Sequence, residues 1–150
     1  MALENQEKVQ LLNTKVIFNA QKTRNNVASG YLTFNQVEIN IGDGFNQSSG
    51  VFTAPIGGIY KMSFSGITGV TENSGSTSGW INVHKNELSM FGIYDLDNTY
   101  GEETYVGRNL AYTWMMKLIK GDKLKLNSYN IHAEDLTPVT FTGELIRIED

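Results

Sequence analysis

Cysteine is absent from the 150 residues, which removes several classes of chemistry. Without thiols the chain forms no disulfide, no thiolate zinc site and no catalytic cysteine, and its redox compartment cannot be inferred from cysteine pairing. An excess of basic residues is also missing, because 12 Lys and Arg face 16 Asp and Glu, a formal charge of −4. Since phosphates and acidic membrane surfaces attract basic faces, neither nucleic acid nor a membrane surface is an expected partner.

Long hydrophobic segments are lacking as well. No apolar run approaches the roughly 20 residues that span a bilayer, so we expect no membrane insertion. The N-terminal sequence "MALENQEKVQ" has no apolar stretch typical of a secretory signal. The protein is therefore expected to be either cytosolic or secreted, with the signal removed before this sequence begins.

From Lys15 onward the composition is typical of β-structure. Short runs rich in Val, Ile, Thr, Phe and Tyr are separated by Gly, Asn, Asp and Ser. Residues 1–14 are predicted to be a lead-in or the end of a truncated stalk, and residues 15–150 one globular domain. We predict an all-β jelly-roll β-sandwich of about ten antiparallel strands. The runs that predict strands are Lys15–Gln21, Tyr31–Phe34, Gly50–Thr53, Ile59–Val70, Gly79–Lys85, Leu88–Tyr94, Thr104–Leu118, Lys123–Asn130 and Val139–Arg147.

Alternation within these runs indicates which side chains share a face. Tyr60, Met62 and Phe64 fall on one side of a predicted strand, and the polar residues between them fall on the other. The stripe from Leu110 to Leu118 repeats every second residue too. It faces either the core of the sandwich or an axis between subunits, and the sequence leaves both alternatives open.

The segment "FNQVEINIGDGFNQSSGVFTAPIGGIYKMSF" carries the most specific pattern in the chain. It resembles the signature of the globular head domain of complement 1q (C1q), a family of tumour-necrosis-factor-like jelly rolls. All the spacings of that signature match, and the one departure is Met62 in place of Phe, which as a soft apolar residue should still pack in a core. The matching residues are Phe34, Asn40, Phe45, Phe52, Gly58, Tyr60, Met62 and Phe64.

Later landmarks follow in the order that the family shows. "INVHKNE" at Ile81–Glu87 resembles a strand that ends in Lys-Asn-Gly, and "LIKGDKLKL" at Leu118–Leu126 resembles the Leu-x-x-Gly-Asp stretch. "KVIFNA" at Lys15–Ala20 is similar to the opening strand, and "FTGELI" at Phe141–Ile146 to the closing one. The resemblance covers about Lys15 to Ile148, nearly the whole chain.

This resemblance implies a non-enzymatic, secreted recognition domain that acts as a homotrimer. We expect lectin-like, innate recognition of glycans or microbial surfaces, strengthened by avidity. The alternatives are a trimeric signalling or assembly ligand for a protein receptor, and a module that serves only to trimerise a scaffold. The family also implies recognition through loops, here Thr71–Ser78, Asp95–Glu103 and Ala133–Pro138.

An acidic segment, "YDLDNTYGEE", is the best candidate for local binding chemistry. Its carboxylates are hard oxygen donors suited to calcium, although the spacing is not that of an EF-hand loop. By resemblance, Asp95 takes the place of the first calcium-binding acid, while the second place falls on Arg108, whose charge opposes a cation. Calcium at Asp95 is therefore a weakly supported expectation, and the candidate ligand-binding residues of the segment are Asp95, Asp97, Asn98, Tyr100, Glu102 and Glu103.

Other motifs carry less information. Asn46 begins an N-x-S glycosylation acceptor, which matters only if the protein is secreted. "GSTSG" at 75–79 has Thr77 where a nucleophile elbow needs serine, and His84 and His132 do not form a metal-binding spacing. The aromatic residues that could line a ligand pocket rather than the core are Trp80, Tyr105, Tyr112 and Trp114.

Overall fold

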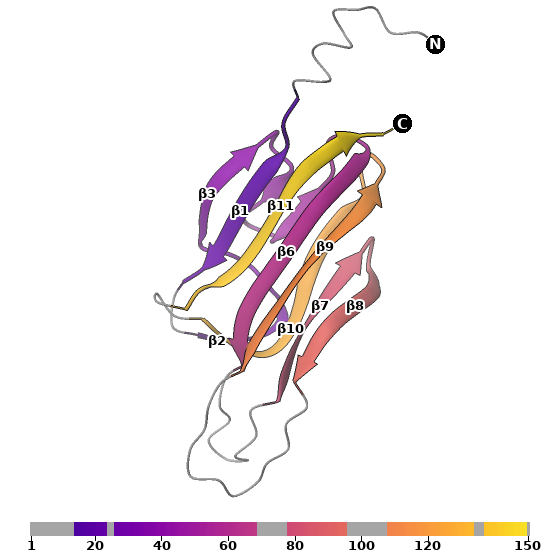
Figure 1. The fold of residues 1–150 in the computed structure, drawn as a ribbon. Coiled ribbons are helices and arrows are strands. Elements are labelled where there is room, and N and C mark those ends of the chain that lie inside the picture. The colour runs from indigo at the N-terminus through magenta and orange to yellow at the C-terminus, as the bar shows by residue number, and fades with distance from the viewer. Residues whose placement is uncertain (1–13, 24–25, 69–77, 96–107, 134–136, 150) are drawn as a thin grey trace, which may run out of the picture.

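The computed structural model describes residues 14–23, 26–68, 78–95, 108–133 and 137–149, and for 26–28 the backbone only. Eleven strands make up this part of the chain, and none of it is helical (Figure 1). Their bounds are β1 Ile17–Lys22, β2 Asn26–Tyr31, β3 Gln36–Ile41, β4 Phe45–Asn46, β5 Val51–Thr53, β6 Gly58–Thr68, β7 Gly79–Lys85, β8 Leu88–Asp95, β9 Asn109–Leu118, β10 Lys123–Ala133 and β11 Val139–Ile148.

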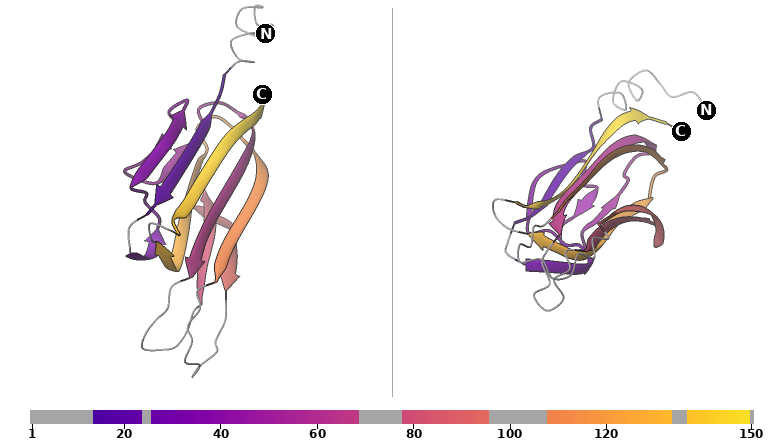
Figure 2. Two further views of the ribbon diagram at one scale, coloured as in Figure 1. Left: turned by 60° about the vertical axis from the view of Figure 1, so that its left-hand side comes forward. Right: turned by 60° about the horizontal axis from the view of Figure 1, so that its bottom comes forward.

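The strands form two layers that face each other, as Figure 2 shows. In the first layer the order is β3-β1-β11-β6-β9, and every pair is antiparallel. In the second layer β10 pairs with β7 on one side and with β2 and β5 on the other, while β8 extends from β7 and β4 from β5. A short pairing of β10 with β6 joins the layers. The all-β jelly roll predicted from the sequence is confirmed.

The predicted strand boundaries need correction at two places. The run Tyr31–Phe34 was expected to be a strand, but β2 ends at Tyr31, and the buried Leu32 and Phe34 lie in the connection to β3. Apolar residues there anchor a loop rather than a strand. The strands β3 and β4 were not expected, although Val37, Ile39 and Ile41 alternate with polar residues along β3, which lies at an edge of the sheet where little of it is buried.

Aromatic side chains fill the space between the layers. Phe18 is central, with ring centroids 4.8 Å from those of Phe45 and Phe52 and 5.0 Å from that of Phe141. Gly143 permits this packing, because a Cβ at that position would lie 2.5 Å from the Phe18 ring. The aromatic residues of the opening signature are almost wholly buried, and so is its Met62. Burial of each such side chain stabilises the fold by about 1.5–3 kcal/mol.

The structure also shows which way the stripe from Leu110 to Leu118 on β9 faces. Leu110, Trp114 and Leu118 are buried and point between the layers, so the stripe faces the core of the sandwich. Tyr112 stays 42% exposed, at the side where β9 approaches β8. If subunits pack around an axis, they therefore use the outer face of this layer. The residues of β9 that lie between the buried ones point to that face.

Substitution of Phe18 tests the aromatic packing. Phe18→Leu leaves a gap among three rings, and we expect the free energy of unfolding to fall by about 1–3 kcal/mol. Leu88→Ala is the control, since Leu88 is 72% exposed and its loss should change the free energy by less than about 0.5 kcal/mol. Denaturant unfolding followed by circular dichroism measures both. Equal stability of the two variants would contradict the central place of Phe18.

Candidate functional site

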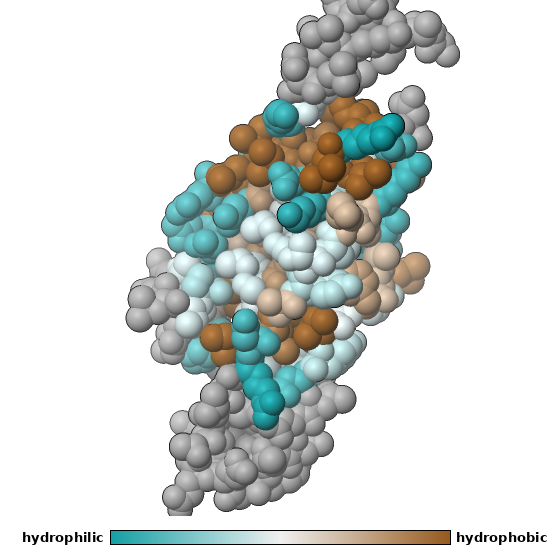
Figure 3. All heavy atoms as spheres, viewed as in Figure 1, coloured by the Kyte–Doolittle hydropathy of each residue, from teal (hydrophilic) through white to brown (hydrophobic). Residues whose placement is uncertain are grey.

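The outer face of the first layer is the larger candidate surface. Its middle is made of small hydroxyl side chains that pair between β6 and β11: Ser63 with Thr142 at 2.5 Å and Ser65 with Thr140 at 2.7 Å. Figure 3 shows this face, with weakly polar residues at its centre and hydrophobic atoms gathered over the ends of β1, β3, β6 and β11 that lie near the chain termini. On the strands of the first layer, the exposed hydrophobic residues include Ile39, Ile41, Met115 and Ile146.

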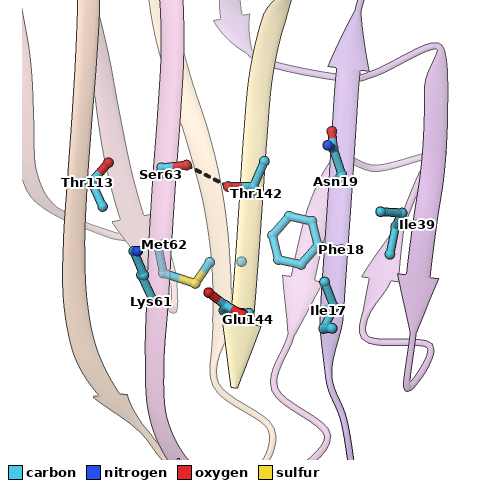
Figure 4. A pocket seen from close by; sticks show the side chains of 11 residues that line it. Ile17, Phe18, Asn19, Ile39, Lys61, Met62, Ser63, Thr113, Thr142 and Glu144 are labelled. Atoms are coloured by element: carbon cyan, nitrogen blue, oxygen red, sulfur yellow. Dashed lines mark hydrogen bonds between the residues drawn. The ribbon is translucent and has the colours of Figure 1, made fainter. Parts of the chain in front are cut away.

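A shallow hollow of about 440 Å³ lies in this face. It lies where β11 runs between β1 and β6, and Figure 4 shows Thr142 and Glu144 on β11 beside it, with Lys61 on β6. Charged and hydroxyl groups line one side of the hollow, and Ile17 and Ile39 line the other. An open, mixed surface of this kind suits contact with another folded chain better than it encloses a small substrate.

The outer face of the second layer is polar and aromatic. Tyr31 on β2 contacts His84 on β7, with the hydroxyl 3.3 Å from Nδ1. The ammonium group of Lys125 lies 3.9 Å from the centroid of the Tyr31 ring and 3.0 Å from a carboxylate oxygen of Glu87. Further along the same face, the rings of Tyr94, Trp80 and Tyr129 stand side by side.

Of the aromatic residues singled out as a possible pocket lining, Tyr112 and Trp114 stack with centroids 5.9 Å apart, but Trp80 does not join them. Trp114 is buried between the layers, whereas Trp80 lies on the outer face of the second layer. Tyr105 lies outside the described residues. Alternation along a strand puts Trp80 and the buried Ile81 on opposite faces, but only the pairing of β7 with β8 and β10 reveals the neighbours of Trp80.

Of the candidate ligand-binding residues in the acidic segment, the structure describes Asp95 alone; Asp97, Asn98, Tyr100, Glu102 and Glu103 lie outside the described residues. Asp95 ends β8, and its carboxylate lies 3.7 Å from the guanidinium Nε of Arg108. The two positions related by the family pattern are thus neighbours in space. Arg108 already supplies positive charge to Asp95, and calcium at this residue stays a prediction.

Metal and catalytic candidates do not gain support from proximity. Among the residues that the structure describes, no three His, Asp or Glu side chains are grouped so that they could hold a metal ion. His84 lies on β7 and His132 lies on β10, and the two are not opposite each other where these strands pair. Within the same residues, nothing helical has the length and apolarity needed to cross a membrane.

Asn46 lies at the surface, where a glycosylation acceptor must be. Its side-chain oxygen accepts a hydrogen bond of 3.2 Å from the backbone N–H of Ser49. It also borders a polar hollow of about 270 Å³ that is lined by Glu87, Lys123 and Lys125, among others. The exposed position permits modification, and glycosylation of Asn46 stays a prediction.

The two downstream landmarks of the sequence meet in one hydrogen-bonded cluster. Asp122 of the "KGD" turn is buried, and it accepts hydrogen bonds of 2.9 Å from the side chain of Asn86 and from the backbone N–H of Ile119. Lys85 lies 3.7 Å from the same carboxylate. Burial raises the pKa of Asp122, but the hydrogen bonds and the lysine charge outweigh it, so the pKa lies below its ordinary value. The cluster ties two turns together and has a structural role.

The Asp122 cluster predicts a pH dependence. A lowered carboxyl pKa stabilises the fold above the pKa of the unfolded chain, and this stabilisation is lost as the pH falls through the folded-state pKa. Asp122→Asn should therefore lower the free energy of unfolding by about 1–3 kcal/mol at neutral pH. In acid, the difference in this free energy between the variant and the wild type should shrink. Thermal unfolding at several pH values measures it. Glu38→Gln on the exposed edge strand is the control, and a pH-independent gap for Asp122→Asn would contradict the assignment.

Comparisons with known proteins agree with this fold. A family model described as "C1q domain" matches residues 5–146. Complement C1q tumor necrosis factor-related protein 3 of Mus musculus is 29% identical over 117 residues, which are 77% of this chain and 44% of that protein. Caprin-2 of Danio rerio is 31% identical over 142 residues, which are 91% of this chain and 14% of that protein. The chain thus spans less than half the length of these curated relatives.

A solved structure extends the agreement to three dimensions. The globular domain of zebrafish complement 1qA protein superposes with a TM-score of 0.70, over 90% of this chain and 99% of that chain. The sequence identity is 18%, so this likeness supports the fold alone.

Proposed function

Because the chain belongs to the C1q domain family, we propose that it is a non-enzymatic recognition domain that acts as a homotrimer and binds glycans of repeated or microbial surfaces. C1q domains are in general trimeric recognition or assembly domains. The observation that carries the proposal for this chain is the pair of unlike outer faces. One has exposed apolar residues at its ends and suits self-association; the other is polar and aromatic and suits a ligand.

Self-association would use the outer face of the first layer. Met115 on β9 is 69% exposed and lies opposite Lys61 in the register with β6, beside the paired hydroxyls of Ser63 and Thr142. Lys61, Lys117 and Glu144 also lie on this face, so a second copy that covers it has to pair their charges across the contact. A stable contact needs roughly 800 Å² on each partner, which this five-stranded face can supply.

Three copies would strengthen a weak contact through avidity. Multivalent binding raises affinity for a repeated surface by roughly 10²–10⁴ without any new contact, provided that the sites can engage together. This argument favours glycan or microbial-surface recognition and a place of action outside the cell.

The second candidate is a trimeric signalling or assembly ligand for a protein receptor, because exposed Trp and Tyr are also typical of protein interfaces. Calcium near Asp95 is a subordinate proposal, weakened by Arg108.

Light scattering after size-exclusion chromatography tests the oligomer. We expect the wild type to elute with a mass near three chains, and Met115→Lys to lower that mass, because it places a second positive charge opposite Lys61 in the contact. Leu88→Lys, in the β7–β8 hairpin of the second layer, is the matched control and should keep the trimer. A wild-type monomer would overturn the proposed assembly.

Binding of the same sample to a glycan array, with calcium and with chelator, tests the ligand class. Selective hits on a trimer would support lectin-like recognition. A trimer without hits would favour the protein receptor. If the chelator abolishes glycan binding, this would support a calcium ion at Asp95. Asp95→Asn should then abolish the same binding.

A further inference from the structure

Three aromatic side chains form one row across the outer face of the second layer. Trp80 on β7 lies opposite Tyr94 on β8 and Tyr129 on β10 in the strand registers. Its ring is stacked with that of Tyr129, with centroids 4.6 Å apart and an interplanar angle of 21°. The ring of Tyr94 is tilted on the other side, with its centroid at 6.1 Å. We call these three residues the aromatic row.

The aromatic row contributes nothing to the core between the layers. Its neighbours Ile81 and Val83 on β7 point inward and are fully buried, whereas Tyr94 is 52% and Tyr129 41% exposed. Cross-strand stacking stabilises the sheet, but it leaves the ring faces turned away from Trp80 in contact with water. Exposed aromatic groups of this kind mark places where a partner binds.

Amide groups lie beside the row. Asn82, two residues along β7 from Trp80, is opposite Asn127 of β10 and Gly92 of β8. Gly92 leaves space for the Asn82 side chain, because a Cβ on Gly92 would overlap the Asn82 oxygen. That oxygen is buried and has no hydrogen-bond partner among the described residues. The surface thus places the outward ring faces beside two amide side chains, and a ligand reaches the covered Asn82 oxygen once that side chain turns.

Charge narrows the class of ligand. The aromatic row and its two amides carry no formal charge, and Lys125 on the same face is already paired with Glu87. A net charge of −4 disfavours nucleic acid, whose bases could otherwise stack on the rings. A purely apolar partner would leave the amides unpaired. A neutral sugar satisfies both features, since a pyranose ring has a face of C–H groups and a rim of hydroxyls.

We propose that the aromatic row, together with Asn82 and Asn127, is the binding site for a neutral hexose in a glycan. The C–H face of the sugar stacks on the exposed ring faces of Tyr129 and Tyr94, and its hydroxyls bond to the amides. The site rests on the proposed glycan-binding function and places it on paired strands rather than loops. It lies on the opposite side of the sandwich from the face that would self-associate, so three copies remain accessible in a trimer.

Titration of the full chain with neutral disaccharides (lactose, maltose, cellobiose and mannobiose) tests the site. Of the two tryptophans, Trp114 is 9% exposed and Trp80 lies in the row, so bound sugar should change the emission of Trp80. Array binding by Tyr129→Ala should be about tenfold weaker, whereas Tyr129→Phe, which keeps the ring, should bind nearly as the wild type does. Asn82→Ala should also weaken binding.

Tyr31→Ala is the matched control, because Tyr31 is 49% exposed on the same face but contacts His84 and Lys125 instead of the row. Light scattering must show that each variant keeps the wild-type mass. Loss in Tyr129→Ala with retention in Tyr31→Ala supports the site. Equal binding by all variants, or binding of acidic glycans alone, overturns the site but leaves glycan recognition intact. A wild-type trimer that binds no glycan overturns both.

Discussion

The packing of aromatic rings between two antiparallel layers is the constraint on which the rest of this structure depends. Phe18 contacts three other rings at once, and Gly143 is small enough to let it do so. Because interiors are close-packed, these contacts determine how far apart the layers lie and how their strands align. Every outward-facing residue then takes its place by alternation along strands that the core holds in register.

The consequence is a sandwich with two outer faces of different chemistry. The first layer presents the hydroxyl pairs of β6 and β11, with isoleucine, methionine and the charged Lys61 and Glu144 around them. The second layer carries amides, an imidazole and the aromatic row. A domain that assembles through one face and recognises a ligand through the other needs this division, because a single surface cannot be both covered and accessible.

Electrostatics has a local, structural role in the described residues. The buried carboxylate of Asp122 joins the turn that follows β9 to the hairpin between β7 and β8, and its hydrogen bonds outweigh its desolvation. Arg108 and Asp95 bring together the ends of β8 and the segment before β9 in a similar way. Residues that the sequence presents as landmarks or metal ligands thus act here as ties between neighbouring strands.

The sequence alone determined the fold class and most of the core, since burial of large apolar side chains at fixed spacings leaves a periodic pattern that local analysis can read. The resemblance of the segment from Phe34 to Phe64 to the C1q signature then pointed to the jelly roll. The edge strand β3 was missed although Val37, Ile39 and Ile41 alternate with polar residues, and the two residues of β4 are too few to show a period. Only the tertiary structure decided which outward residues become neighbours: Trp80 and Tyr129 meet through the pairing of β7 with β10, and Asp122 meets Asn86 in the same way. Strand pairing is a long-range property, so no local spacing in the chain encodes it.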